Sequence, residues 1–180
     1  MTPRTVRLLD ALDAHRAAFT ARLDALPDAV VHAKPAPGAW SLAQLAEHFV
    51  RIDAGLRLDG PMASAAARAT SGLRSRALAG VLSLPLRIPA PASAAGVMPS
   101  AAPRWPDVRE RWAALRAGWR RASPAGGAIA FEHPIAGPFL LDDALAFLLA
   151  HHRHHDAQIR RTLRAVTPEP EVAAGTLQTA

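Results

Sequence analysis

Four histidines lie within five positions near the end of the chain, in the segment HHRHHDAQI at residues 151–159. They follow the apolar run LAFLLA, so titratable rings stand where a helix would continue with core residues. On a helix that advances by about 100° per residue, His155 lies in the apolar stripe, and His151 and His152 lie within or beside it. Two histidines one turn apart on a buried face can bind one ion together. The segment therefore predicts a metal site.

The helical period allows two ligand pairs, His151 with His155 or His152 with His155. The competing interpretation is a histidine-rich helix end whose rings form hydrogen bonds within the core or reach solvent. A catalytic metal site usually has a third protein ligand and keeps positions open for water or substrate. His48 is the candidate, because it lies two turns into another amphipathic helix, at the margin of its apolar face. We therefore expect a site built between two helices.

The elements that must position these residues are helices. Alanine and leucine dominate the sequence, whereas valine and isoleucine are few and alternating stretches are rare, so an all-α fold is expected. Ser41 and Gln44 in WSLAQL predict a capping box at the start of the second helix. Apolar residues at steps of three and four predict helices over residues 5–26, 42 to about 58, 62–84, a stretch after Pro106, and 140–166.

Segments rich in proline predict the connections. Residues 27–39 break the first helix, and residues 85–106 form a long Pro/Ala-rich crossover without helical period. Residues 131–139, FEHPIAGPF, are expected to form a turn-rich approach to the last helix. Four principal helices with one long crossover indicate a four-helix bundle. We expect a single domain over residues 1–166 and a flexible tail over 167–180.

The net charge is +6, and arginine supplies every basic side chain except Lys34. The arginine clusters lack the interleaved aromatics and recognition motifs of nucleic-acid-binding proteins. The chain has no cysteine, which excludes disulfides, thiolate metal sites and a cysteine nucleophile. No window reaches the roughly 20 apolar residues that span a bilayer, and the N-terminus lacks the apolar stretch of a signal peptide. We expect a cytoplasmic protein that acts on a small molecule, with no nucleic-acid or membrane partner.

Two segments, WSLAQLAEHF and HPIAGPFLLDDALAFLLAHHRHHDAQI, resemble the DinB-like (YfiT/DinB) superfamily of metal-binding four-helix bundles. In that family a Trp-Ser or Trp-Thr pair opens the second helix, which supplies one histidine ligand. The last helix supplies two more, spaced His-x-x-x-His and followed by Gln-Ile. The resemblance implies the metal ligands His48, His151 and His155, and it favours His151 over His152. Its motifs lie between Pro35 and Arg161, and residues 60–105 match only loosely.

The resemblance implies a fold and a metal triad more than a reaction. Members with assigned roles include S-transferases and isomerases that use low-molecular-weight thiols such as bacillithiol or mycothiol. The absence of cysteine is compatible with a thiol supplied by a small molecule and activated by a metal. We expect a divalent-metal enzyme of the thiol-dependent S-transferase type, or else an isomerase or hydrolase; three histidines suit zinc, nickel, iron or manganese. The alternatives are a non-catalytic metal-binding bundle and a helical partner-binding module.

Several neighbouring residues receive secondary roles. Gln158 is expected to orient a ligand or to hydrogen-bond a metal-bound water, and His152 and His154 to lie beside the ligands or at the surface. Glu47 lies about 100° around the helix from His48, so we expect it at the surface or beside the site rather than as a general base. The resemblance also allows a homodimer, although no exposed apolar stripe in the sequence identifies an interface. The remaining candidates are interpreted as structural or receive no role: Asp142 and Asp143 in the first turn of the last helix, His133 in its turn, His15 and His32.

Overall fold

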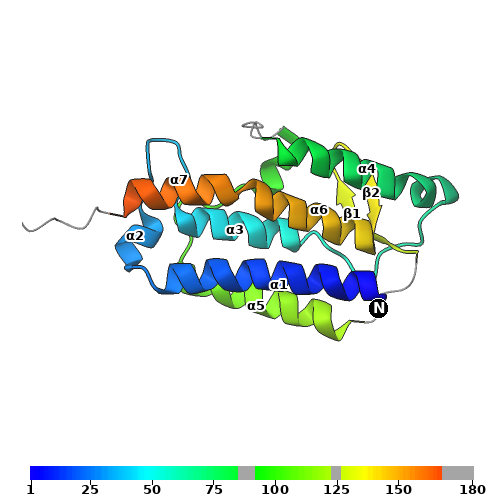
Figure 1. Cartoon of the computed structure of the whole chain (residues 1–180), viewed down its shortest axis with the longest axis horizontal. Helices are drawn as coiled ribbons and strands as arrows, with labels where there is room; N and C mark the ends of the chain where they lie inside the picture. The colour runs from blue at the N-terminus through cyan, green and yellow to red at the C-terminus, as the bar shows by residue number, and fades with distance from the viewer. Residues whose placement is uncertain (85–91, 123–126, 168–180) are drawn as a thin grey trace, which may run out of the picture.

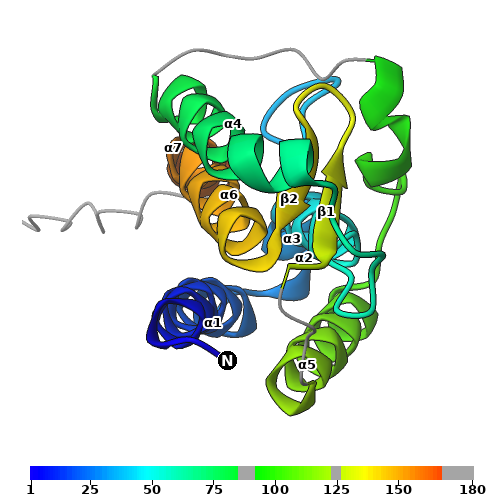
Figure 2. The same cartoon turned by 90° about the vertical axis from the view of Figure 1, so that its right-hand side faces the viewer.

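The computed structural model describes residues 1–84, 92–122 and 127–167. It is mainly helical, which confirms the all-α prediction. Long helices run alongside one another as a bundle, and one further helix packs on the outside of it, against the helix of residues 141–154 (Figures 1 and 2). The helices of the bundle are α1 (Pro3–Asp24), α3 (Leu42–Asp53), α5 (Trp105–Arg121), α6 (Leu141–His154) and α7 (Asp156–Val166), and the outer one is α4 (Ala65–Ser83). The predicted tail lies, from residue 168 on, outside the described residues.

The helix α3 begins where the sequence predicts. Ser41 Oγ accepts a hydrogen bond from the backbone N–H of Gln44, and the Gln44 side chain accepts one from the N–H of Ser41, which completes the capping box. The helix ends at Asp53, earlier than the predicted end near Leu58. The N–H of Arg57 donates instead to the carbonyl of Ala130, 2.7 Å away, and this contact turns the chain toward the segment before α6.

That segment is a β-hairpin and not only a turn. Strands β1 (Ile129–His133) and β2 (Gly137–Leu140) pair antiparallel, with Phe131 opposite Phe139. Gly137 has φ +74°, a conformation that favours glycine at the turn. Two other segments predicted to be irregular also contain short helices: α2 (Asp28–His32) before α3, and the 3₁₀ helix η1 (Ala92–Val97) in the crossover, of which residues 85–91 lie outside the described part.

The predicted last helix, 140–166, is two helices that meet at His155. The N–H of His155 donates to the carbonyl of His152, three residues back, at 3.1 Å, whereas the N–H of Ile159 returns to the normal four-residue step. The tightened turn therefore separates α6 from α7 beside the histidine cluster.

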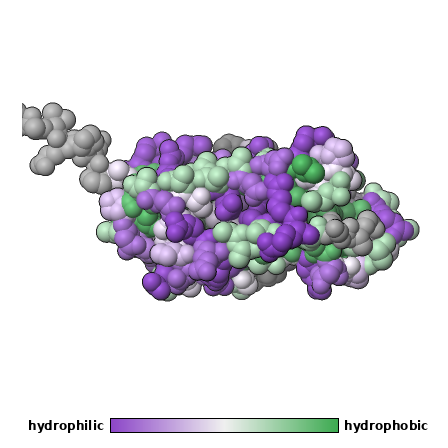
Figure 3. Space-filling model, turned by 90° about the horizontal axis from the view of Figure 1, so that it is seen from below, coloured by the Kyte–Doolittle hydropathy of each residue, from purple (hydrophilic) through white to green (hydrophobic). Residues whose placement is uncertain are grey.

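The core has two parts along the bundle. One part lies between α6, the hairpin and the first turns of α1, and the other surrounds Phe49 and Trp112, which are fully buried. Asp13 of α1 pairs with the buried Arg116 and with Arg120, both of α5. The face over these two helices is mainly hydrophilic (Figure 3). Within the described ranges, no helix combines the length and the apolar character needed to cross a lipid bilayer.

Candidate metal centre

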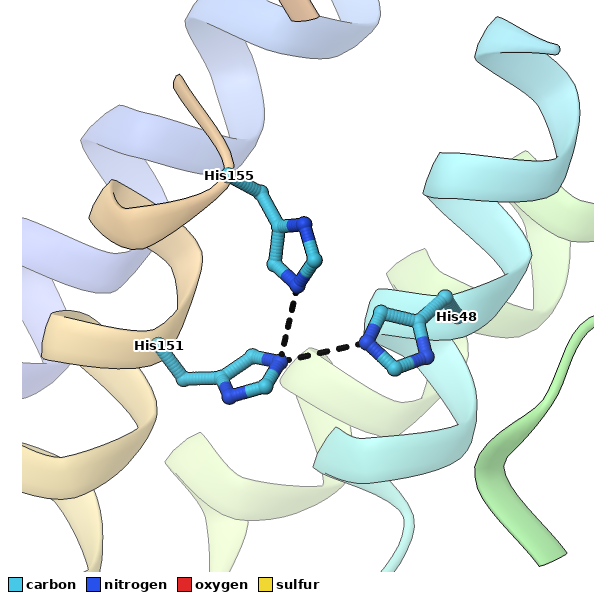
Figure 4. Close-up of side chains that lie close together, drawn as sticks. All are labelled: His48, His151 and His155. Atoms are coloured by element: carbon cyan, nitrogen blue, oxygen red, sulfur yellow. Dashed lines mark hydrogen bonds between the residues drawn. The ribbon is translucent and has the colours of Figure 1, made fainter. Parts of the chain in front are cut away.

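The structure brings together three of the predicted site residues, His48, His151 and His155 (Figure 4). His48 comes from α3, His151 from the last turn of α6, and His155 from the junction of α6 and α7. The Nε2 atom of His151 lies 3.1 Å from Nε2 of His48 and 3.2 Å from Nε2 of His155. Two ligands that bind one tetrahedral ion at about 2.0–2.1 Å stand roughly 3.3 Å apart, so these separations fit a shared ion.

Hydrogen bonds on the far side of two rings fix their tautomers. Nδ1–H of His48 donates to the carbonyl oxygen of Val97 at 2.8 Å, and Nδ1–H of His155 donates to Oε1 of Gln158 at 2.9 Å. In a neutral imidazole the other nitrogen then carries a lone pair. Both Nε2 atoms therefore face His151 as acceptors, and the single proton of His151 can serve only one of them. A cation at this point satisfies all three nitrogens.

Burial keeps these rings neutral. Desolvation lowers the pKa of His48 below its usual 6.5, although the bond to Val97 opposes the shift. Desolvation and the neighbouring histidines hold the pKa of His151 well below 6.5, and desolvation with the charge of His48 lowers the pKa of His155 to about 3. Because a metal binds the neutral imidazole, the three side chains are in the ligand form at physiological pH. The three histidines could hold a metal ion.

Aromatic rings surround the cluster. Trp40, which precedes the α3 cap, packs on His48 with ring centres 4.9 Å apart. Phe49 meets His155 edge-on at 5.5 Å, and Phe147 lies 5.8 Å from His151. These contacts restrict the rotamers of the histidines and reduce the access of water around them.

A second layer of contacts holds the segment that carries Val97. Glu47 is 3% exposed, and its Oε2 accepts hydrogen bonds of 2.7 Å from both the N–H and the hydroxyl of Ser100. Gln44 donates from its side-chain amide to the carbonyl oxygens of Ser100 (2.8 Å) and Ala101 (3.3 Å). Residues 97–101 are thereby fastened along α3. Glu47 lies beside the site, and its carboxylate contacts this segment and Arg51 rather than the histidines.

His152 points into a different network. Its Nε2–H donates to Oδ1 of Asp53 at 3.1 Å, and Trp112 Nε1–H donates to Oδ2 of the same carboxylate at 2.8 Å. All three side chains are at most 1% exposed. Sequence reasoning missed Asp53, although a signal existed: it interrupts the apolar stripe of α3 four residues after Phe49, as His155 does in the last helix.

The other candidates make contacts away from the triad. Nδ1–H of His154 donates to the carbonyl of Leu82, which ties the end of α4 to α6. His133 accepts from two N–H groups of its own turn. The two aspartates in the first turn of α6 accept hydrogen bonds from hydroxyl groups: Asp142 from Thr5 of α1, and Asp143 from Ser71 of α4. His15 and His32 form hydrogen bonds outside the cluster, His15 with the carboxylate of Asp156 and His32 with the carbonyls of Asp28 and Pro103.

The family model of the DinB superfamily matches residues 11–159, which include α3, the hairpin, α6 and all three clustered histidines. The chain belongs to the DinB superfamily. No curated protein and no solved structure matched the sequence. In this DinB superfamily protein, the three histidines that could hold a metal ion all lie within the matched residues.

Proposed function

We propose that this DinB superfamily protein is a divalent-metal enzyme of the thiol-dependent S-transferase type, with His48, His151 and His155 as the ligands. The observation that supports the proposal most strongly is the set of three neutral imidazoles, two of them held with the lone pair of Nε2 inward, in a chain without cysteine. Zinc, nickel, iron and manganese all accept such a donor set.

A bound divalent ion would supply Lewis acidity that lowers the pKa of a small thiol at neutral pH. The residues around the ligands have separate tasks. Val97 and Gln158 keep His48 and His155 in the ligand tautomer, and the aromatic rings limit water around the cluster. Since no cysteine is present, the sulfur nucleophile comes from a low-molecular-weight thiol, which is a substrate rather than part of the protein.

The first experiment is metal analysis by mass spectrometry on protein purified without an affinity histidine tag. We expect about one equivalent of a divalent metal in the wild type and its loss in His48→Ala, His151→Ala and His155→Ala. His154→Ala is the matched control, because His154 lies on α6 but bonds to Leu82. No metal after reconstitution near neutral pH would reject the proposal.

Turnover is tested next with bacillithiol, mycothiol and glutathione as thiols, against a panel of alkylating electrophiles. Thiol consumption that depends on metal and stops in His155→Ala supports the enzyme. Full metal occupancy without turnover for any thiol would reject the S-transferase assignment in favour of a non-catalytic metal-binding bundle.

A further inference from the structure

A groove opens on one side of the histidine cluster. It has a volume of about 990 Å³ and lies between the loop before α3, the C-terminal end of α4, and the junction of α6 and α7. In Figure 1 the loop lies above α7 and that end of α4 lies above α6, on either side of the junction. His155 and Gln158 line the groove, as does Trp40. One candidate metal ligand and its hydrogen-bond partner therefore form part of its wall.

The charge of the groove is one-sided. Arg153 of α6 and Arg160 and Arg161 of α7 all line it, and no aspartate or glutamate is among its described lining residues. None of the three arginines pairs with a carboxylate in the part of the chain that the structure describes, although many arginines elsewhere do. Three guanidinium groups around one concave surface create a positive potential that attracts anions, and each can bind a carboxylate through two parallel hydrogen bonds.

Most of the rest of the lining is apolar, apart from Ser83, His154 and Thr162. Alanines and Pro35 form much of the wall, and Trp40, Leu82 and Leu84 supply larger apolar surfaces. The volume lies at the upper end of the range for small-molecule sites. The groove therefore fits a small molecule with apolar parts and more than one carboxylate.

We infer that this groove binds a small carboxylate-bearing thiol, with its carboxylates at Arg153, Arg160 and Arg161 and its sulfur toward His155. The inference rests on the proposed function for the role of the sulfur. The recognition of the carboxylates is independent of it, because the arginines do not take part in the histidine cluster.

The test uses S-methylglutathione, which has two carboxylates and no free thiol, and follows binding by tryptophan fluorescence and calorimetry. Trp40 reports on the groove, since the other three tryptophans are buried in the bundle. We expect Arg153→Gln, Arg160→Gln and Arg161→Gln each to weaken binding by about five- to tenfold. Arg164→Gln is the matched control: it removes the same charge from α7 outside the groove, and should change binding less than about twofold.

The dimethyl ester of S-methylglutathione should not bind detectably. Equal losses in all four arginine variants, equal binding of the ester, or no binding of S-methylglutathione at millimolar concentration would each overturn the inference. Reduced glutathione should bind more tightly than its S-methyl form, with the difference lost in His155→Ala. Equal affinities of reduced glutathione and S-methylglutathione would overturn the placement of the sulfur at His155. The groove would then bind the carboxylates of the electrophilic reactant instead.

Failure of the groove and failure of the proposed function are distinguishable. If the protein takes up no metal on reconstitution but still binds S-methylglutathione through the three arginines, the groove is retained and the metal enzyme is rejected. Protein with metal and thiol turnover, in which the arginine variants behave like Arg164→Gln, would retain the enzyme and reject the groove.

Discussion

The carbonyl oxygen of Val97 and Nδ1 of His48 lie 2.8 Å apart, and this contact links a candidate metal ligand to the crossover segment between α4 and α5. The segment is in turn fastened to α3 by Glu47 and Gln44, on the same helix as His48. The orientation of one ligand therefore depends on two side chains that contact none of the three clustered imidazoles.

Removing the carboxylate of Glu47 is the direct test of this dependence. Glu47→Ala should weaken metal binding by about tenfold, because loss of a hydrogen-bonding layer around metal ligands typically costs 10–100-fold in affinity. Affinity is measured by competition with a chelator, and circular dichroism confirms the fold. Glu110→Ala, which removes an exposed carboxylate on α5, should leave the affinity unchanged. Equal affinities in both variants would show that residues 97–101 hold their position without Glu47.

Gln158 offers a second, independent test of ligand orientation. Gln158→Leu removes the acceptor of Nδ1–H in His155, so the ring loses its fixed tautomer, and metal affinity should fall by about tenfold. Gln158→Glu keeps an acceptor oxygen and should bind metal at least as well as the wild type. If the two variants behave alike, the contact has no part in metal binding.

The buried histidines make the metal-free protein sensitive to acid. His48, His151 and His155 take up protons below pH 6.5 in the unfolded chain, but their lowered pKa values shift this uptake to lower pH in the folded one. The free energy of unfolding should therefore fall as the pH drops below 6.5, by at most about 1.4 kcal/mol per pH unit for each histidine. Urea denaturation with chelator, between about pH 5 and pH 7, measures the slope. His155→Leu should reduce it by the share of one histidine, and an unchanged slope would contradict this explanation.

Asp53 is expected to be a stability determinant of the bundle. Asp53→Ala leaves Trp112 Nε1–H and His152 Nε2–H buried without their common acceptor, and should lower the free energy of unfolding by about 3 kcal/mol or more. Asp59→Ala, which removes an exposed carboxylate nearby, should change it by less than about 0.5 kcal/mol. Urea denaturation at neutral pH compares the two. Similar values would mean that the polar network contributes little to stability.

Much of the fold could be predicted from local pattern. The capping box of Ser41 and Gln44 marks the start of α3, and apolar steps of three and four locate the long helices. The early end of α3 could not be predicted, because it depends on a hydrogen bond between Arg57 and Ala130, far apart in the sequence. The hairpin was not predicted for a different reason: its two strands are too short to show an alternation of apolar and polar residues.

The clustered histidines could be predicted from the sequence, but the groups that hold them in place could not. Histidines at helical spacing indicated a metal site, and only the family resemblance chose His151 over His152, which bonds to Asp53. The partner of His48 could not be predicted, because a backbone carbonyl has no signature in the sequence. The burial of Glu47 likewise depends on where residues 97–101 pack, and no helical period contains that information.

The two halves of the cluster are 103 residues apart along the chain. During synthesis on the ribosome, a nascent chain that has not yet reached residue 151 contains only one of the three imidazoles, and cannot form the site. Once α6 has packed against α3, an ion bound by all three would act as a cross-link that closes residues 48–155 into one loop. Metal loading would therefore require that α6 has packed against α3, and a bound ion would stabilise that arrangement.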